Sequence, residues 1–472
     1  MRSMRAVFLG RDEDKQMMKT TSTHLEEQPE GPAQGTHDKN ASIETPNTSR
    51  AHLLWLLRVV GWGVLLVLCG LMLVNQVFTA SREMSDFCQD YTAARRLTQG
   101  IPVYLPLRCW SDSGIVHVPA PLEYDAHPPP SILLIWPLSL LPMVPAAALW
   151  GLISLAAYLT SGFLLLRALG WRSLRNFALF VVGSLFWQPF IYSQTLQNTG
   201  QMLLVLLVGA WLLERRNAGW AGALIGLAGL LRVWPAVLLL VALIQHRWRL
   251  FWSGITTLLL GTIVTTLAMG PGAYAAYLGP VRASELYWIP TEGNISLVSA
   301  VVRPLTGYRD PPLVLSPLVS GVGLEQAALL GQILAGILLV AALVLLWWCG
   351  RRAPGEPVNL LSQGLMVTVL LLIFPLTWLW ELILLLLPLT TIILALRQLP
   401  RPPRRWFALV ALGLLPQLGP YYLNAFLEWL ASRQVQGLAG SETLLFGVPT
   451  YGLLLFAGAQ AWLLWKASDL KK

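Results

Sequence analysis

Residues 54–78 read LWLLRVVGWGVLLVLCGLMLVNQVF, with Arg58 as the single charged side chain. A run this long and this apolar is typical of a helix that crosses a lipid bilayer, which takes about 20 residues. It is soon followed by Ser85-Asp86-Phe87-Cys88-Gln89-Asp90-Tyr91, so two carboxylates lie just past its end. Ionisable groups at a membrane span are costly unless they are used, which makes this cluster a candidate functional site.

The composition of the whole chain is that of a membrane protein. Of its 472 residues, 55% are hydrophobic and 12% are charged, and the mean hydropathy is +0.59, whereas soluble domains carry about 25% charged residues. The net charge of +9 comes from short basic clusters between apolar runs. These clusters form no basic face interleaved with aromatic residues, so the sequence does not indicate a nucleic-acid partner.

Twelve apolar runs follow one another along the chain. They fall at 54–78, 145–167, 176–192, 200–213, 218–231, 233–246, 250–270, 326–348, 358–374, 377–396, 406–423 and 446–466. Charged residues and Pro235 interrupt the stretch from 200 to 246, which is typical of broken helices that line a cavity. The sequence therefore predicts an all-α, polytopic membrane protein with about twelve transmembrane helices and with amphipathic helices in its first outer loop.

The basic residues between these runs predict the orientation of the chain. With twelve spans, the clusters that fall on one side are Arg167, Arg172 and Arg175; Arg215 and Arg216; Arg247 and Arg249; Arg351 and Arg352; Arg397, Arg401, Arg404 and Arg405; and Lys466, Lys471 and Lys472. Basic loops stay in the cytoplasm. We therefore expect a multi-pass plasma-membrane protein with both termini in the cytoplasm and with the loops 79–144, 193–199, 271–325 and 424–445 outside.

The domain organisation follows from the same pattern. Residues 1–52 are polar and poor in aromatic residues, which predicts a disordered cytoplasmic tail ahead of an uncleaved signal anchor. Residues 53–270, with the first outer loop 79–144, are expected to form a catalytic transmembrane module. A long outer loop, 271–325, then precedes a C-terminal transmembrane module, 326–472.

Polar motifs from distant parts of the chain are expected at the outer face. They are the Asp86–Tyr91 cluster, the stretch Tyr124-Asp125-Ala126-His127 before three prolines, Asn198-Thr199-Gly200-Gln201, Arg232-Val233-Trp234-Pro235 and Gly293-Asn294-Ile295-Ser296-Leu297. Their predicted meeting at one membrane face is more informative than any one of them alone.

In their order and spacing, over residues 53 to 396, these motifs resemble those of the membrane glycosyltransferases of family 87. That family belongs to the C-type superfamily and includes polyprenol-phosphate-mannose-dependent α-mannosyltransferases. The residues that carry the resemblance are Asp86-Phe87, Tyr91, Ala93-Ala94, Leu97, Gly100 and Tyr104-Leu105-Pro106; Tyr124 with His127-Pro128-Pro129; Asn198-Thr199-Gly200-Gln201; Arg232-Val233-Trp234-Pro235; and Gly293-Asn294-Ile295-Ser296-Leu297.

One element departs from the family pattern. Where the family has an aromatic residue followed closely by an acid and a histidine, this chain reads Phe374-Pro375-Leu376-Thr377-Trp378-Leu379-Trp380-Glu381. Trp380 therefore stands at the position of the histidine, and the acid has moved to Glu381. The contribution of that histidine to sugar or phosphate binding is then either missing or supplied by His127.

The resemblance implies an inverting transfer of a sugar, expected to be mannose, from a polyprenyl-phosphate donor to a lipid or glycolipid acceptor. Asp86 stands at the catalytic position and would act as the general base, while Arg232 would hold the donor phosphate. The other expected substrate-binding residues are Asp90, Tyr91, Tyr124, His127, Asn198, Gln201, Asn294 and Glu381. The chemistry demands no metal and no cofactor.

Structural alternatives stay open for several of these residues. Asp86 lies where a helix N-cap is expected, and Asp90 shares its helical face. Arg232 could extend to the membrane interface, and His127 before its prolines could be a rigid loop residue. Asn294-Ile295-Ser296 also reads as a glycosylation acceptor.

Two of the four cysteines, Cys88 and Cys109, fall in the first outer loop. An outer location is oxidising, so we expect these two to form a disulfide bond.

Two other classes of function fit a polytopic chain. One is a lipid or glycan transporter or flippase, which would show repeat symmetry and charges deep in its spans; neither is evident here. The other is a glycan polymerase or ligase that uses lipid-diphosphate substrates, which would favour more arginines in the outer loops.

Overall fold

The computed structural model describes residues 48–83, 86–105, 110–111, 114–115, 127–196, 198–291, 293–310, 313–319, 321–353, 355–419, 425–426 and 442–469. The chain divides into two units, Met1–Leu56 and Leu57–Lys472. Both predicted transmembrane modules and all the predicted site residues belong to the second unit, to which the following account is confined except where α1 is named.

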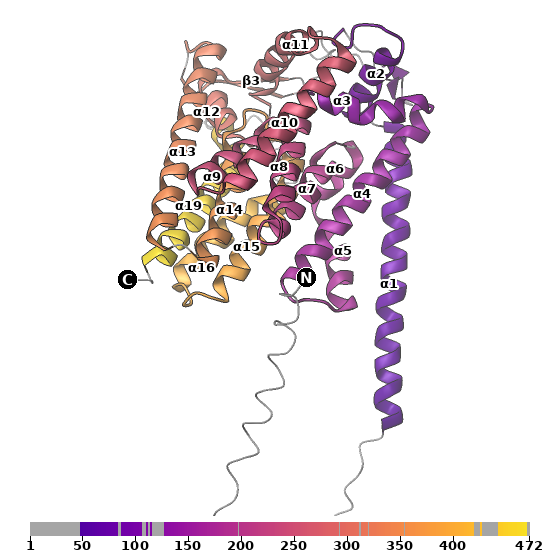
Figure 1. The fold of residues 1–472 in the computed structure, drawn as a ribbon, viewed down its shortest axis with the longest axis vertical. Helices are drawn as coiled ribbons and strands as arrows, with labels where there is room; N and C mark the ends of the chain where they lie inside the picture. Colours follow the sequence, from indigo (N-terminus) through magenta and orange to yellow (C-terminus); the bar gives the residue numbers. More distant parts are fainter. Residues whose placement is uncertain are drawn as a thin grey trace, which may run out of the picture. The chain divides into compact units, whose positions relative to one another are not determined.

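The second unit is built almost entirely of helices (Figure 1). The longer helices are α1 (Thr48–Glu83), α2 (Asp86–Thr98), α4 (Met143–Ala168), α5 (Leu174–Phe186), α7 (Gly200–Leu213), α8 (Ala218–Leu231), α10 (Trp248–Met269), α11 (Ala273–Trp288), α12 (Leu297–Thr306), α13 (Leu324–Arg352), α14 (Glu356–Ile373), α15 (Leu386–Leu396), α16 (Arg404–Leu418) and α19 (Val448–Asp469).

Short elements connect them. They are α3 (Pro129–Ile135), η3 (Trp136–Leu140), α6 (Gln188–Leu196), η4 (Trp234–Val237), α9 (Leu238–Ile244), η5 (Leu379–Leu385) and α18 (Glu442–Leu445), with two antiparallel hairpins, β1–β2 (Trp110–Ser111 and Gly114–Ile115) and β3–β4 (Tyr308–Asp310 and Leu313–Leu315). The predicted all-α, polytopic fold is confirmed, and each of the twelve apolar runs coincides with one or two helices.

Fewer than twelve of the described helices are long enough to cross a membrane. In the described part of the chain, seven helices are long and apolar enough to cross a bilayer, and eight if the bent pair α5–α6 counts as one span. The axes of α5 and α6 meet at 73°, where Pro189 in the first turn of α6 cannot donate a hydrogen bond back into α5. The count of twelve spans stays a prediction.

Helices α7 and α8 are each shorter than a membrane span. Each has 14 residues, which at 1.5 Å per residue makes it about 21 Å long, against roughly 30 Å for the hydrocarbon core of a bilayer. They correspond to the interrupted stretch between 200 and 246. Both ends of this pair therefore lie at or inside the apolar layer that α4 and α10 can cross.

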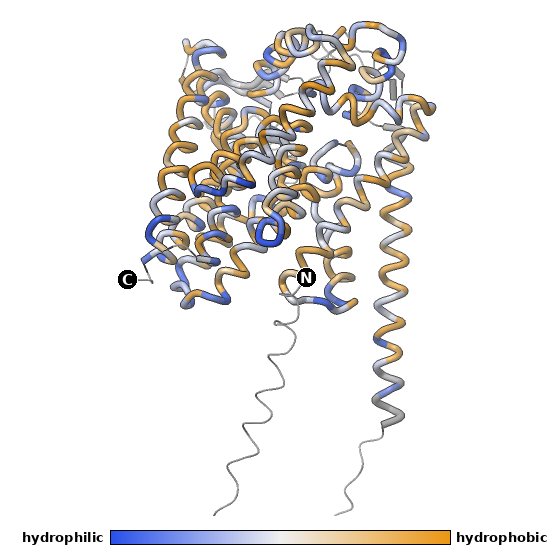
Figure 2. The backbone as a smooth tube through the Cα atoms, in the orientation of Figure 1, coloured by the Kyte–Doolittle hydropathy of each residue, from blue (hydrophilic) through white to orange (hydrophobic). Residues whose placement is uncertain are grey.

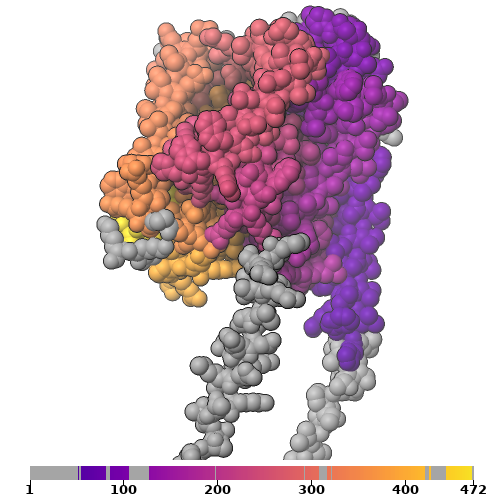
Figure 3. Space-filling model, in the orientation of Figure 1, coloured from indigo at the N-terminus to yellow at the C-terminus, as the bar shows by residue number. Residues whose placement is uncertain are grey.

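Glycines let α8 approach α10 closely. A Cβ atom on Gly222 would lie 2.1 Å from the carbonyl oxygen of Leu250, and one on Gly226 would lie 2.6 Å from that of Gly254. Small residues four apart permit this kind of helix contact within membranes. Figure 3 shows the residues of α10 as a band that crosses this face of the unit, and α8 packs along it.

The basic turns of the chain gather at one end of the bundle. Ion pairs join Arg215 to Glu356 at 2.9 Å, Arg352 to Asp469 at 3.5 Å, and Arg247 to Glu214. These ion pairs connect the α7–α8 turn, the α9–α10 turn, the α13–α14 connection and the end of α19. We call this end of the bundle the basic end. Figure 2 shows hydrophilic residues at these turns and hydrophobic residues along the helices between them.

Candidate active site

The loop 79–144 contains the helix that carries Asp86. Helix α2 starts at Asp86, whose side chain is half-buried. The apolar face of α2 includes Phe87, which stacks on Trp150 of α4 with ring centroids 6.4 Å apart, and packs against Ile132 of α3. The predicted helix is therefore present, and its packing fixes Asp86 at the open end. A position at a helix N-terminus favours the charged form of a carboxylate.

A buried pair lies one turn further along α2. The carboxylate Oδ1 atom of Asp90 lies 2.8 Å from Nδ1 of His127, and the two residues are 4% and 5% exposed. The hydroxyl of Tyr104 donates to the backbone carbonyl oxygen of His127 at 2.9 Å. Buried polar groups need such partners. Asp90 thus holds the ring of His127, and Tyr104 holds its backbone. A residue that only makes a loop rigid would need no partner for its ring.

Glu381 links this region to the C-terminal half of the chain. It lies in η5, is 2% exposed, and accepts a hydrogen bond from the backbone nitrogen of Trp378 at 3.3 Å. Its carboxylate interacts electrostatically with Arg232, Asp86 and His127. We call Asp86, Asp90, His127, Arg232 and Glu381 the carboxylate site. Four separate segments of the sequence contribute to it.

Arg232 is positioned by the Asn198–Gln201 motif. Because α8 ends at Leu231, the backbone of Arg232 is extended and its side chain turns toward the start of α7. Its Nε atom donates to the hydroxyl of Thr199 at 3.1 Å. Helices α6 and α7 both pack against η5, which brings this motif beside Glu381. In the described residues, neither terminal nitrogen of Arg232 forms an ion pair, so the guanidinium retains donors for a ligand.

The same motif leaves two buried polar atoms without partners. Asn198 accepts hydrogen bonds from the backbone of Gly200 at 2.8 Å and from Ser193 at 3.1 Å, and Gln201 donates to Gln194 at 3.1 Å. Nδ2 of Asn198 and Oε1 of Gln201 have no partner within the described ranges. Buried polar atoms of this kind call for an explanation, and a bound polar ligand would supply their partners.

The Gly293–Leu297 motif pairs with residues 374–381, the element whose sequence differs from the family pattern. The backbone nitrogen of Ile295 donates to the carbonyl of Thr377 at 2.7 Å, and that of Leu379 donates to the carbonyl of Gly293 at 3.1 Å. Asn294 bridges the two, donating to the carbonyl of Pro375 at 2.7 Å and accepting from the backbone of Ser296 at 3.0 Å.

These contacts change the role expected of Asn294. Its side chain is fully buried and is used on both its oxygen and its nitrogen, so it positions the segment that carries Glu381 rather than offering free donors to a sugar. The same burial keeps it from a glycosylating enzyme in the folded protein.

Arg303 supports this junction, a role that sequence reasoning missed. It is 1% exposed, and its guanidinium donates to the carbonyl oxygens of Asn294 at 2.5 Å and Phe446 at 2.7 Å and to the hydroxyl of Ser299 at 3.0 Å. In the sequence it is one more arginine of an outer loop. No local pattern predicts that it joins α12 to the start of α19.

The tryptophans of residues 374–381 form an aromatic platform. The rings of Trp378 and Trp380 stack with centroids 4.9 Å apart and 7° between their planes, and Trp288 meets Trp378 edge-on at 5.5 Å. Both stacked rings are partly exposed. The sequence had marked Trp380 only as a replacement for histidine; the structure adds that it widens a flat apolar surface next to Glu381.

Other predicted residues lie elsewhere or outside the described residues. Tyr91 is buried, donating to the carbonyl of Leu141 at 2.7 Å and accepting from Arg95 at 2.8 Å, so its hydroxyl serves the loop packing. Tyr124 and Cys109 fall outside the described residues. Cys88 is part of a disulfide bond, whereas Cys69 and Cys349 are free. The pairing of Cys88 with Cys109 stays a prediction.

Among the residues with described positions, no three His, Cys, Asp or Glu side chains are placed to hold a metal ion together. The carboxylate site instead joins carboxylates to one guanidinium and one imidazole, a set suited to proton transfer and to binding an anionic group.

Comparison with known proteins agrees with the geometry. The chain is 26% identical over 263 residues to the α-(1→3)-arabinofuranosyltransferase of Corynebacterium glutamicum, covering 51% of this chain and 57% of that protein. The chain thus spans a little over half the length of this relative. No solved structure matches it. The sequence model of glycosyltransferase family 87 matches residues 126–375, which is more than half of the chain and includes His127 and Arg232 of the site. The protein therefore belongs to glycosyltransferase family 87.

Proposed function

We propose that this membrane glycosyltransferase transfers a sugar, with inversion, from a polyprenyl-phosphate donor to a hydroxyl group of a lipid or glycolipid acceptor. The observation that carries the proposal is the grouping of Asp86, His127 and Arg232 around the buried Glu381, whose carboxylate is influenced by the charge of each. It unites a candidate base and a candidate phosphate-binding group, which the reaction requires together.

In the proposed reaction, Asp86 takes the proton of the acceptor hydroxyl as its oxygen attacks the anomeric carbon. The bond between that carbon and the phosphate oxygen breaks, and the lipid phosphate leaves with the electron pair. The half-buried position of Asp86 at the open start of α2 supports access by an acceptor. A phosphate is a good leaving group, so no strong general acid is needed.

The charge that develops on the leaving phosphate needs a cationic partner. Arg232 is suited to this because a guanidinium matches phosphate geometry and because Thr199 fixes its Nε atom. The imidazole of His127 would supply a further donor to an anion, with Asp90 holding the ring in place. Donors fixed before the reaction stabilise a developing charge without reorganisation.

The sugar would lie against the Trp378–Trp380 platform, within reach of Asn198 and Gln201. The flat face of a sugar ring fits an aromatic surface, and the unpartnered Nδ2 and Oε1 atoms suit sugar hydroxyls. We propose mannose or arabinofuranose as the sugar. Mannose is expected from the resemblance to polyprenol-phosphate-mannose enzymes, and arabinofuranose from the activity named for the corynebacterial relative.

The depth of the site favours a lipid donor. Arg232 and Thr199 lie at the ends of α7 and α8, which are about 21 Å long and thus shorter than the hydrocarbon core of a bilayer, so we place the site at the level of the membrane. A phosphate on a membrane-bound isoprenoid could reach this level, whereas a soluble nucleotide sugar has no need of it. We place the site on the outer face, with both termini in the cytoplasm, from the distribution of basic residues.

The test is a transfer assay in membranes that contain the wild-type protein or a variant. Radiolabelled polyprenyl-phosphate-mannose and polyprenyl-phosphate-arabinofuranose are supplied in turn with a lipid extract as acceptor. We expect transfer from one donor, loss of transfer in Asp86→Asn, and a roughly 100-fold lower kcat in Arg232→Gln. Glu325→Gln, at the exposed start of α13, is the matched control and should retain full activity.

Three results would contradict the proposal. Transfer that survives in Asp86→Asn but disappears in Asp90→Asn would assign the base to Asp90. Transfer from a lipid-diphosphate donor alone would point to a polymerase or ligase. Movement of an intact labelled lipid across the bilayer, with no new glycosidic bond, would point to a flippase.

A further inference from the structure

A second polar cavity lies at the basic end, away from the carboxylate site. It has a volume of about 480 Å³, and its lining includes Arg215, Arg247, Arg249, His246 and Glu214. We call it the arginine cavity. Helix α7 runs from the carboxylate site to this cavity, which separates the two by about 21 Å. Nothing in the proposed transfer uses it.

The charges that line the cavity leave it positive. Arg247 is paired with Glu214, and Arg215 with Glu356, which lies beyond the lining. Arg249 is exposed and forms no ion pair among the described residues. With both ion pairs counted, the guanidinium of Arg249 is left as the excess positive charge, which attracts an anion.

His246 lies at the end of helix α9. Its φ angle is +56°, in the left-handed region that favours glycine. The backbone nitrogens of His246 and Arg247 donate to the carbonyls of Leu243 and Ala242, as at a helix end that normally carries glycine. His246 thus takes the place of that glycine. Its exposed imidazole lines the cavity, with its ring 5.9 Å from that of Trp248.

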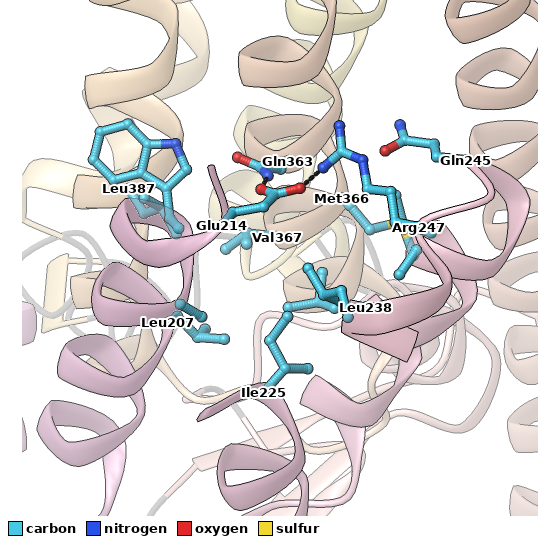
Figure 4. A pocket seen from close by; sticks show the side chains of 15 residues that line it. Leu207, Glu214, Ile225, Leu238, Gln245, Arg247, Gln363, Met366, Val367 and Leu387 are labelled. Atoms are coloured by element: carbon cyan, nitrogen blue, oxygen red, sulfur yellow. Dashed lines mark hydrogen bonds and ion pairs between the residues drawn. The ribbon is translucent and has the colours of Figure 1, made fainter. Parts of the chain in front are cut away.

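An apolar slot adjoins the cavity. It lies between α7, α8, α9 and α14, with a lining that includes Leu207, Ile225, Leu238 and Met366. Figure 4 shows Glu214 between the amide of Gln363 and the guanidinium of Arg247 at the mouth of this slot. Arg247 and Glu214 line both spaces, so the polar cavity and the apolar slot share these side chains as part of their walls.

Two further features indicate an occupant that is partly polar and partly apolar. Nε2 of Gln245, which lines the slot, is buried without a partner in the described part of the chain. Trp248, which lines the cavity, is exposed, as are Trp220 and Trp252 near the starts of α8 and α10, and exposed tryptophans mark the level of lipid headgroups. A soluble phosphate would use the cavity but not the slot.

We propose that the arginine cavity and its apolar slot form a binding site for an anionic membrane phospholipid. The phosphate lies among Arg249, Arg247 and His246, and an ester oxygen accepts from Gln245. The start of one acyl chain enters the slot. This lipid is distinct from the sugar donor, because it binds at the opposite end of α7.

The test is native mass spectrometry of the full-length protein in detergent, titrated with phosphatidylglycerol, with phosphatidylcholine, or with inorganic phosphate. We expect wild-type protein to retain one phosphatidylglycerol in preference to phosphatidylcholine. Arg249→Gln should weaken that affinity by about five-fold, the amount typical of one basic residue near a lipid surface. Arg216→Gln removes the same charge from the same turn as Arg215 but outside the cavity lining, so it should bind as wild type does.

The variant His246→Gly distinguishes a loss of lipid binding from a loss of folding. Glycine relieves the left-handed backbone, so this variant should be at least as thermally stable as wild type, yet bind phosphatidylglycerol less tightly. Equal losses in Arg216→Gln and Arg249→Gln would reduce the effect to general surface charge and overturn the proposal. So would equal retention of the two lipids, or full displacement of phosphatidylglycerol by inorganic phosphate. None of these outcomes depends on glycosyl transfer.

Discussion

The imidazole of His127 and the carboxylate of Asp90 lie 2.8 Å apart in the interior of the loop 79–144, although 37 positions separate them in the sequence. Both side chains are nearly inaccessible to solvent, and the electrostatic influence of His127 reaches Glu381. Asp90 thereby sets the orientation of the ring to which we assign phosphate binding.

This pair is expected to act as a unit. Asp90→Asn and His127→Ala should each lower kcat by about 100-fold, because misplacing a positioned group by about 1 Å has that effect. The double variant should lose no more than either single one, since coupled residues are non-additive. Transfer assays at saturating donor provide the measurement. Losses that multiply in the double variant would show that the two residues act separately.

The Trp378–Trp380 platform is expected to contribute to donor binding. An aromatic stack contributes about 0.5–1.5 kcal/mol, so Trp380→Ala should raise the KM for the sugar donor by up to about ten-fold, and Trp380→Phe by less. Trp220→Ala, an exposed tryptophan on α8, is the control. An unchanged KM in Trp380→Ala would remove the platform from the sugar site.

Arg303 is expected to stabilise the fold without touching substrate. Arg303→Met leaves two carbonyl oxygens and one hydroxyl without their donor, and unsatisfied buried groups cost about 1–3 kcal/mol each. A clearly lower Tm in detergent is expected, with Arg303→Lys intermediate because an ammonium lacks the guanidinium fork. The exposed Arg405 gives the comparison variant, Arg405→Gln, for which Tm should not change.

Glu285 on α11 gives a prediction of pH dependence. Burial raises the pKa of this carboxyl, and the nearby Arg282 offsets part of that effect. A folded-state pKa above the unfolded one means that the carboxyl disfavours folding once it ionises, so its penalty is absent at low pH and grows as pH rises through the folded pKa. Glu285→Gln should therefore raise Tm at pH 7 and have little effect at pH 4. A gain of equal size at both pH values would rule out ionisation as its cause.

The disulfide of Cys88 predicts a defined count of thiols. If Cys109 is its partner, protein denatured without reductant should take up two alkylating groups, at Cys69 and Cys349, and reduced protein four. Closing a loop of about 20 residues contributes about 3 kcal/mol, so reductant should also lower Tm. Four alkylated cysteines without reductant would exclude the bond in the purified protein.

The helices could be predicted from the sequence because their apolar runs are long and continuous. The interruptions at Glu214 and Arg232 likewise predicted the short pair α7 and α8. The distribution of hydropathy carries that information locally, residue by residue, and needs no knowledge of the packing.

The pairing of side chains within the site could not be predicted in the same way. Nothing in the sequence joins Asp90 to His127 or Asn294 to Pro375, since both contacts depend on how separate segments pack. Asn294 was expected to bind substrate because its motif resembles that of the family, yet its hydrogen bonds serve the backbone around it. Motif order predicted which segments meet; it did not predict which side chain faces the ligand.

The backbone pairing of Gly293–Ile295 with Thr377–Leu379 has a consequence for building a smaller enzyme. The family match ends at residue 375, but the residues after it complete the site. Glu381 lies beyond that limit, and Thr450 and Phe446 hold Ile295 and Arg303 from the last helical segment. A chain cut at the family boundary would leave the backbone groups of Gly293 and Ile295 without the partners that Thr377 and Leu379 provide. The catalytic half of this protein therefore needs the C-terminal helices to form a complete site.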